Sequence, residues 1–137
     1  MKKTIYSTLL LLFVAFYGMA QTANVKVESG APGAAPNFEW VETTHNFGDI
    51  PQGTPVTYEF EFVNSGQVPL IISNVRGSCG CTVTDYSKEP VAPGEKGMVK
   101  ATYNAKALGA FNKSIRVTAN VEGGSEVLYI KGKVLNQ

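Results

Sequence analysis

The sequence predicts an all-β domain, and two observations carry that prediction. Apolar and polar side chains alternate with a period of two along several stretches, the pattern of strands with one buried and one exposed face. Glycine, proline and asparagine gather between those stretches, where turns are needed. No stretch shows a sustained 3.6-residue apolar period, so almost no helix is expected. About seven or eight short strands in roughly 100 residues are typical of an immunoglobulin-like antiparallel β-sandwich.

The clearest predicted strand covers residues 56–63. Its apolar face is formed by Val56, Tyr58, Phe60 and Phe62. Three later stretches alternate in the same way, with apolar faces formed by Val99, Ala101 and Tyr103, by Ile115, Val117, Ala119 and Val121, and by Leu128, Ile130 and Val134. Residues 70–75 are apolar on both faces, which favours a central position in a sheet.

Three segments between these strands carry the residues that turns require. Asn64-Ser65-Gly66 is expected to supply a positive φ after the first long strand. Ala92-Pro93-Gly94-Glu95 fits a turn with proline second and glycine third. Glu122-Gly123-Gly124-Ser125 fits the loop of a hairpin that joins the last two strands.

Residues 1–20 have the layout of a secretory signal peptide. Lys2 and Lys3 precede an apolar run from Ile5 to Tyr17, and Gly18-Met19-Ala20 supplies small residues before a cleavage point at Gln21. A transmembrane anchor is the alternative, but this run is shorter than the roughly 20 residues that a spanning helix needs. We therefore expect a secreted or periplasmic protein without a membrane anchor after cleavage.

Residues 21–37 are rich in small residues and proline and are predicted to be a flexible linker. They contain the run Gly30-Ala31-Pro32-Gly33-Ala34-Ala35-Pro36, and the folded domain is predicted to span residues 38–137. The chain has 137 residues, which suits a single domain. Cleavage after Ala20 removes two lysines, so the formal net charge moves from +1 to −1. A charge this small argues against nucleic-acid binding.

Three segments together resemble a known family. They are His45-Asn46-Phe47-Gly48-Asp49-Ile50-Pro51-Gln52-Gly53, the run Phe62-Val63-Asn64-Ser65-Gly66-Gln67-Val68-Pro69-Leu70-Ile71-Ile72, and Val75-Arg76-Gly77-Ser78-Cys79-Gly80-Cys81-Thr82. In this order they resemble the bacterial exported family catalogued as domain of unknown function 1573, over about residues 44–134. The first two are also similar to Hydin-like and major-sperm-protein-like immunoglobulin-fold modules. The resemblance to the family implies an exported sandwich but no particular activity, whereas the similarity to these modules implies a non-enzymatic domain that binds other proteins.

Cys79 and Cys81 form the candidate binding or redox site of the sequence. On a regular strand both would project to the same face as Val83. Four interpretations are open: a local disulfide, which Gly80 would help to close; thiols that face inward or pair with another molecule; ligands of a soft metal such as monovalent copper or zinc; and a catalytic thiol. A bridge across one residue closes a very small ring and would add little stability.

The other polar residues show no arrangement that indicates catalysis. His45 is the single histidine, and we expect a surface or hydrogen-bonded structural role for it. Phe47 and Gly48 are expected to bury a ring where the chain bends, with Asp49 capping the turn. We therefore expect no enzymatic activity and no cofactor. The leading hypothesis is an exported module that binds a protein or glycan of the cell envelope through its loops or an edge strand. A thiol-based metal or redox function at Cys79 and Cys81 is the alternative.

Overall fold

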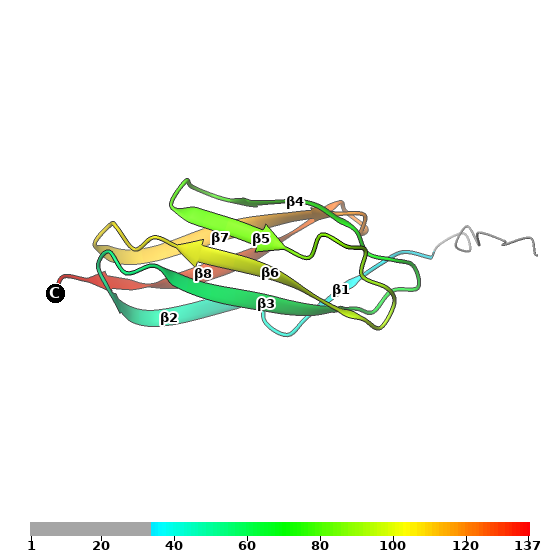
Figure 1. Ribbon diagram of the computed structural model, residues 1–137, viewed down its shortest axis with the longest axis horizontal. Coiled ribbons are helices and arrows are strands. Elements are labelled where there is room, and N and C mark those ends of the chain that lie inside the picture. Colours follow the sequence, from blue (N-terminus) through cyan, green and yellow to red (C-terminus); the bar gives the residue numbers. More distant parts are fainter. Residues whose placement is uncertain (1–33) are drawn as a thin grey trace, which may run out of the picture.

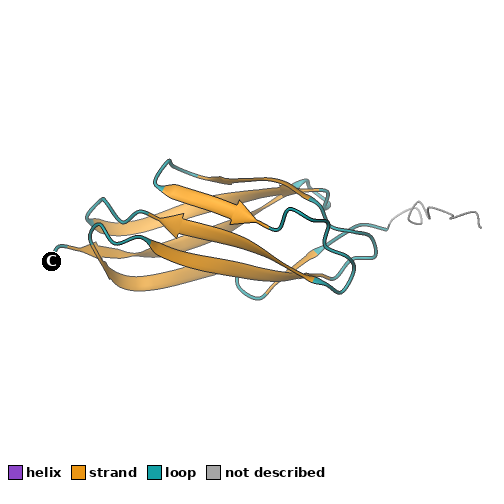
Figure 2. Cartoon of the chain, in the orientation of Figure 1, coloured by secondary structure: helices purple, strands orange, loops and turns teal. Residues whose placement is uncertain are grey.

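The computed structural model describes residues 34–137 (Figures 1 and 2). The predicted signal peptide, residues 1–20, and most of the predicted linker, residues 21–37, lie outside this range. The described part contains eight strands and no helix. The strands are β1 (Phe38–Trp40), β2 (Thr44–Pro51), β3 (Val56–Asn64), β4 (Ile72–Gly77), β5 (Thr82–Tyr86), β6 (Lys96–Tyr103), β7 (Gly109–Ala119) and β8 (Ser125–Leu135). Within residues 34–137 no helix could cross a membrane.

The strands form two four-stranded sheets that pack face to face (Figure 1). The first sheet has the order β1-β3-β6-β5 and the second β2-β8-β7-β4. All pairs are antiparallel except β2 with β8, which is parallel. The predicted immunoglobulin-like sandwich is therefore confirmed, with one parallel pair that alternation alone does not reveal.

The core lies between the two sheets and is built from the predicted apolar faces. Phe60 and Phe62 of β3 are fully buried, as are Val99 on β6 and Ile115 on β7. The residues that alternate with these core residues along each strand lie on the outer face of the sheet, as the period of two requires. The same alternation on β8 buries Leu128, Ile130 and Val134.

Two of the three predicted turns have the expected backbone. Gly94 has a φ of 80°, and the N–H of Glu95 donates to the carbonyl of Ala92 at 2.9 Å. Gly123 and Gly124 have φ values of 81° and 78° in the β7–β8 hairpin. These conformations favour glycine because it has no Cβ.

The third turn is formed in a different way from the prediction. Neither Asn64 nor Gly66 has a positive φ. Instead Asn64 is fully buried, and its side chain holds the loop. Its Oδ1 accepts from the N–H of Gly66 at 2.9 Å, and its Nδ2 donates to the carbonyls of Val68 and Val91 at 2.8 and 2.9 Å. The loop is therefore ordered by a side chain and not by backbone freedom.

The prediction that residues 70–75 lie centrally is wrong. β4 is an edge strand of the second sheet and pairs only with β7 among the described strands. Ile71 is 47% exposed, whereas Leu70 and Ile72 are buried. The run is apolar on both sides because an isoleucine occupies the exposed position 71, and a register shift between Ile72 and Asn74 then breaks the alternation before the buried Val75.

The Phe47-Gly48 segment bends as expected, but inside a strand. β2 has an irregularity between Asn46 and Asp49, and Gly48 has a φ of 70° there. Phe47 packs against the core. The side chain that caps the bend is Asn46, whose Oδ1 accepts from the N–H of Gly48 at 2.9 Å, and not Asp49 as predicted.

Candidate functional site

Cys79 and Cys81 lie in the tight turn that joins β4 to β5, and they are disulfide-bonded. Their Cα atoms are 5.2 Å apart, within the range of a bridge and shorter than two residues of an extended strand would allow. The turn at Gly80 provides this approach. Among the four interpretations from the sequence, the structure has the local disulfide.

The turn is held against the rest of the domain by backbone hydrogen bonds. The carbonyl of Cys81 accepts from the N–H of Asn104 at 3.0 Å, and the N–H of Ser78 donates to the carbonyl of Ser114 at 2.8 Å. Both cysteines are half-buried, and Cys81 packs against the core. The disulfide therefore lies on a fixed turn that solvent can reach.

The expectation that both cysteines share a face with Val83 does not hold. Val83 lies on β5 and is 68% exposed, whereas Cys81 contacts the core. β5 begins only at Thr82, after the turn. The rule that every second residue faces the same side therefore does not extend from Val83 back to Cys79 and Cys81.

The bonded pair limits the chemistry of the site. A disulfide has no thiolate, so soft-metal ligation or nucleophilic catalysis by Cys79 or Cys81 requires prior reduction. Residues 34–137 hold no cluster of three or more His, Cys, Asp or Glu side chains suited to a metal ion. As a disulfide, the pair can accept attack by an external thiolate, which would form a mixed disulfide with one sulfur and release the other.

His45 closes the seam between β2 and β3, where the two sheets meet. Its ring stacks on Tyr58 with centroids 3.6 Å apart, and its Nδ1 lies 3.3 Å from Oε1 of Glu42. The hydroxyl of Tyr58 donates to the other oxygen of Glu42 at 3.0 Å. Burial, followed by the bond to Glu42, raises the pKa of Tyr58 above its ordinary value of 10.0. These contacts give His45 the structural role expected from the sequence, through ring packing and its proximity to Glu42.

β3 has an unpaired stretch beside this seam. β1 pairs only with residues 62–64 of β3, and one further bond joins the N–H of Val41 to the carbonyl of Glu61 at 3.0 Å. Residues 56–60 pair with β6 on one side, and no described strand pairs with them on the other. We call residues 56–60 the open edge.

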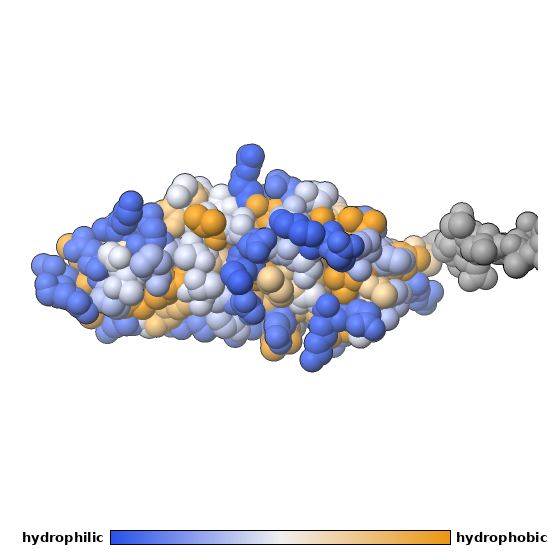
Figure 3. Space-filling view, in the orientation of Figure 1, coloured by the Kyte–Doolittle hydropathy of each residue, from blue (hydrophilic) through white to orange (hydrophobic). Residues whose placement is uncertain are grey.

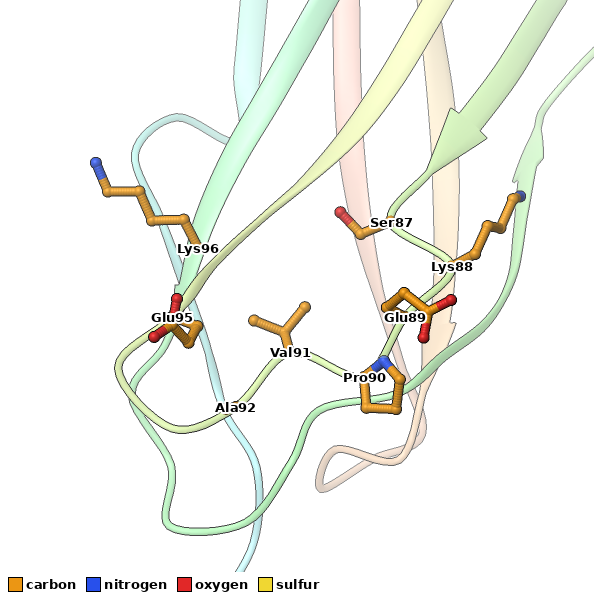
Figure 4. A pocket seen from close by; sticks show the side chains of 8 residues that line it. All are labelled: Ser87, Lys88, Glu89, Pro90, Val91, Ala92, Glu95 and Lys96. Atoms are coloured by element: carbon orange, nitrogen blue, oxygen red, sulfur yellow. The ribbon is translucent and has the colours of Figure 1, made fainter.

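A groove of about 430 Å³ lies at the opposite end of the domain from the cysteine turn, in the β5–β6 loop. Its lining includes Lys88, Glu89, Glu95 and Lys96, with Val91 buried at its base (Figure 4). The two lysines extend away from each other on opposite sides of the groove. Its mixed charges favour no class of ligand. Local sequence patterns do not indicate this groove, because residues of a loop form most of it.

Comparison with known proteins gives one family match. Residues 38–134 match the family described as protein of unknown function (DUF1573). No curated protein matches the chain in sequence.

Several solved structures have the same fold. A protein of unknown function from Porphyromonas gingivalis W83 has a TM-score of 0.66 and 14% identity, covering 79% of this chain and 51% of that one. The ASH/PapD-like domain 7 of human CEP192 has a TM-score of 0.62 and 9% identity, covering 85% of this chain and 96% of that one. The secreted serine protease VesC of Vibrio cholerae has a TM-score of 0.55 and 14% identity, covering 74% of this chain and 23% of that one. The chain thus spans 51% of the first bacterial protein and 23% of the second, and all three likenesses are likenesses of fold.

Proposed function

The chain belongs to the DUF1573 family, and we propose that it is an exported, non-enzymatic β-sandwich module that binds an extended segment of an envelope protein. The observation that carries this proposal is the open edge of β3. A glycan is the other envelope partner that the sequence left open.

The open edge offers backbone hydrogen bonds to a partner strand. On β3, the carbonyl of Glu61 points toward β1 and the N–H of Asn64 toward the β6 side. Because backbone groups alternate along a strand, the N–H and C=O groups of Thr57 and Glu59 point to the side without a partner. Exposed groups of this kind are a template for strand addition.

The seam beneath the open edge supports the same proposal. His45 and Phe47 lie there and are only partly buried. A strand added beside residues 56–60 would lie over these rings and remove apolar surface from water, which favours binding. Backbone bonds would supply affinity and contacts to the rings would supply selectivity.

Two observations support export. The first is the predicted signal peptide at residues 1–20. The second is the disulfide between Cys79 and Cys81, because disulfides persist in oxidising compartments such as the periplasm and the cell exterior. The fold is also found in a protein described as a secreted protease.

The test places a photo-crosslinking amino acid at Thr57 in the full chain, expressed in cells with an envelope. We expect a covalent adduct with one envelope protein, and no such adduct when the same amino acid replaces Leu108, which is 54% exposed in the β6–β7 loop. Glu59→Pro removes an N–H from the open edge without removing a bond to β6, so it should abolish the adduct. Glu59→Gln keeps that N–H and should retain it.

Circular dichroism verifies that each variant keeps its fold. Equal adducts from positions 57 and 108, or an adduct that survives Glu59→Pro, would contradict the proposal.

A second candidate function is thiol–disulfide exchange at the cysteine turn, favoured by the accessible disulfide. An attacking thiolate would bond to Sγ of one cysteine while the other leaves as a thiolate. Incubation with reduced glutathione should then give an adduct of the protein with one glutathione, detected by intact mass after acid quenching. A protein whose mass is unchanged across a range of glutathione concentrations would exclude this candidate.

A further inference from the structure

The outer face of the second sheet is basic. Arg76 on β4, Arg116 on β7, and Lys131 and Lys133 on β8 are all exposed. Within residues 34–137 none of these four takes part in an ion pair. We call this surface, defined by the four cations, the basic face. Asp49 on the edge strand β2 lies opposite Lys133 in register but does not form an ion pair with it.

Arg76 and Arg116 lie directly opposite each other in the β4–β7 register. Like charges in directly opposed positions destabilise a sheet pair. Nη1 of Arg116 donates to Oγ of Ser125 at 3.2 Å, which leaves most of its N–H groups free. An anion between the two guanidinium groups would relieve the repulsion and accept paired hydrogen bonds.

The cations lie at the two ends of a strip of surface along β7 and β8, which we call the track. Arg116 pairs with Val127, and Lys131 and Lys133 follow on the same strand. At about 3.4 Å per residue, the track from position 127 to position 133 is about 20 Å long. A single small anion cannot reach both ends, whereas a chain with repeated negative charges can.

The middle of the track is neutral and offers an aromatic ring and hydrogen-bonding groups. Tyr129 is 42% exposed, with Ser114 opposite it on β7, and Asn112 lies opposite Lys131. An exposed tyrosine can pack against the C–H face of a sugar ring, and hydroxyl and amide groups can bond to sugar hydroxyls. This combination suits a carbohydrate better than a lipid headgroup layer, because the track has one exposed ring and no extended apolar patch.

The outer face of the first sheet differs in charge. It carries Glu59, Glu61 and Asp85, and Lys100 there is 3.2 Å from Glu59. Figure 3 looks onto this first sheet and shows hydrophilic side chains running across it between separate hydrophobic patches. The first-sheet face therefore carries both signs of charge, with Lys100 paired to Glu59 and Lys88 to Asp85, whereas the four cations of the basic face have no ion-pair partner within residues 34–137.

We propose that the basic face binds an acidic polysaccharide, with the Arg76–Arg116 pair and Lys131–Lys133 on its carboxylate groups and Tyr129 against a sugar ring between them. This surface is separate from the open edge of β3, so the binding proposed here and strand addition can succeed or fail independently.

The experiment measures binding of the purified exported chain to polygalacturonate, a uronic-acid polymer, by isothermal titration calorimetry. Dextran serves as the uncharged polymer and polyglutamate as an acidic peptide chain. Arg76→Gln combined with Arg116→Gln should weaken polygalacturonate binding by about tenfold or more, because charge-assisted hydrogen bonds are lost. Lys131→Gln with Lys133→Gln should also weaken it, and Tyr129→Ala should weaken it without changing its salt dependence.

The matched control is Lys96→Gln with Lys106→Gln, which removes the same charge from exposed positions outside the basic face. It should change affinity by less than about twofold if the face, and not the net charge, is responsible. Equal loss in the control and the arginine variant would overturn the proposal. Binding of polyglutamate as tight as that of polygalacturonate would overturn the assignment to a polysaccharide, as would the absence of polygalacturonate binding at low salt.

Discussion

Asn64 is a buried polar residue that holds one end of the domain together. Its side chain bonds to the β3–β4 loop and to Val91 in the next connection along the same end. A buried side chain with satisfied bonds to several backbone groups is costly to remove, because those groups lose their partners without gaining water. Asn64 therefore ties the two connections together from inside the core.

Asn64→Ala should lower the free energy of unfolding by about 3 kcal/mol. Asn120→Ala is the matched control, because Asn120 also bonds to the β3–β4 loop through Ile71 and Pro69 but is exposed. The control should cost about 1 kcal/mol. Urea unfolding followed by tryptophan fluorescence measures both, and equal costs for the two variants would show that burial of Asn64 does not matter.

The Cys79–Cys81 disulfide should contribute little to stability. In the chain-entropy description, a ring of three residues restricts the unfolded chain by only about 1.5 kcal/mol. Cys79→Ser with Cys81→Ser should therefore leave a folded domain whose free energy of unfolding falls by about 2 kcal/mol or less. Thermal unfolding with and without a reductant provides the comparison, and a variant that fails to fold would mean that the turn needs its bridge.

Residue types alone predicted some of these roles and missed others. The positive φ values at Gly94, Gly123 and Gly124 follow from turn chemistry that is local to a few residues. The role of Asn64 depends on Val91, which is distant in sequence, so local reasoning assigned Asn64 to a backbone turn. The position of the cysteines was predicted only in part, because a turn and not a strand determines their direction.

At the scale of the element, the β3–β6 pair contains a close approach that requires glycine. Phe62 lies directly opposite Gly97, and its ring occupies the space that a Cβ at position 97 would fill. Phe62 is fully buried between the sheets and cannot move aside without disturbing the core.

Gly97→Ala should lower the free energy of unfolding by about 2–3 kcal/mol because the added methyl group overpacks this contact. Gly80→Ala is the control, since a Cβ there meets nothing within 4 Å. Chemical unfolding distinguishes the two. A Gly97→Ala protein as stable as the Gly80→Ala protein would mean that β3 and β6 can separate locally at no cost.

The contact of β2 with β3 should make stability depend on alkaline pH. The pKa of Tyr58 is raised in the folded protein, so the unfolded chain loses this proton first as pH rises. The contribution of Tyr58 to the free energy of unfolding is complete below the ordinary tyrosine pKa of 10.0. It is lost as pH rises through that value and through the higher pKa of the folded protein. Between about pH 8 and pH 11 the wild type should lose more unfolding free energy than Tyr58→Phe.

Tyr129→Phe provides the comparison for this effect, because Tyr129 is exposed on the second sheet. Its loss of stability over the same pH range should equal that of the wild type, measured by urea unfolding. Identical curves for Tyr58→Phe and the wild type would contradict the effect.

Alternation predicted β3, β6, β7 and β8, but it did not reveal β1, β2 or β5, nor which strands lie at an edge. The apolar faces of β3, β6, β7 and β8 follow the period of two, so their buried residues were correct. The central position predicted for residues 70–75 is wrong because Ile71 is apolar but exposed next to an edge strand. Which strands pair is decided by contacts between distant segments, which a local pattern does not contain.

At the scale of the whole molecule, folding gathers onto one sheet face four positive charges that are far apart in the sequence. Arg76, Arg116, Lys131 and Lys133 are spread over nearly 60 positions, and the pairing of β4, β7 and β8 brings them onto one face. The formal net charge gave no indication of this surface, because acidic residues elsewhere in the chain balance its four positive charges. The fold class was thus accessible from the sequence, whereas the basic face and the open edge required the topology.

The export of the whole molecule and the removal of residues 1–20 can also be tested. Lys2 and Lys3, the apolar run and the small residues before Gln21 should direct export and cleavage when the full chain is expressed in a bacterium. Intact mass of the protein from the envelope fraction should correspond to a chain beginning at Gln21, with two hydrogens missing because Cys79 and Cys81 are bonded. Leu10→Arg places a charge in the apolar run and should leave an uncleaved chain inside the cell. A wild-type protein that stays in the cytoplasm at full mass would contradict export, and with it the compartment in which both proposed partners are expected.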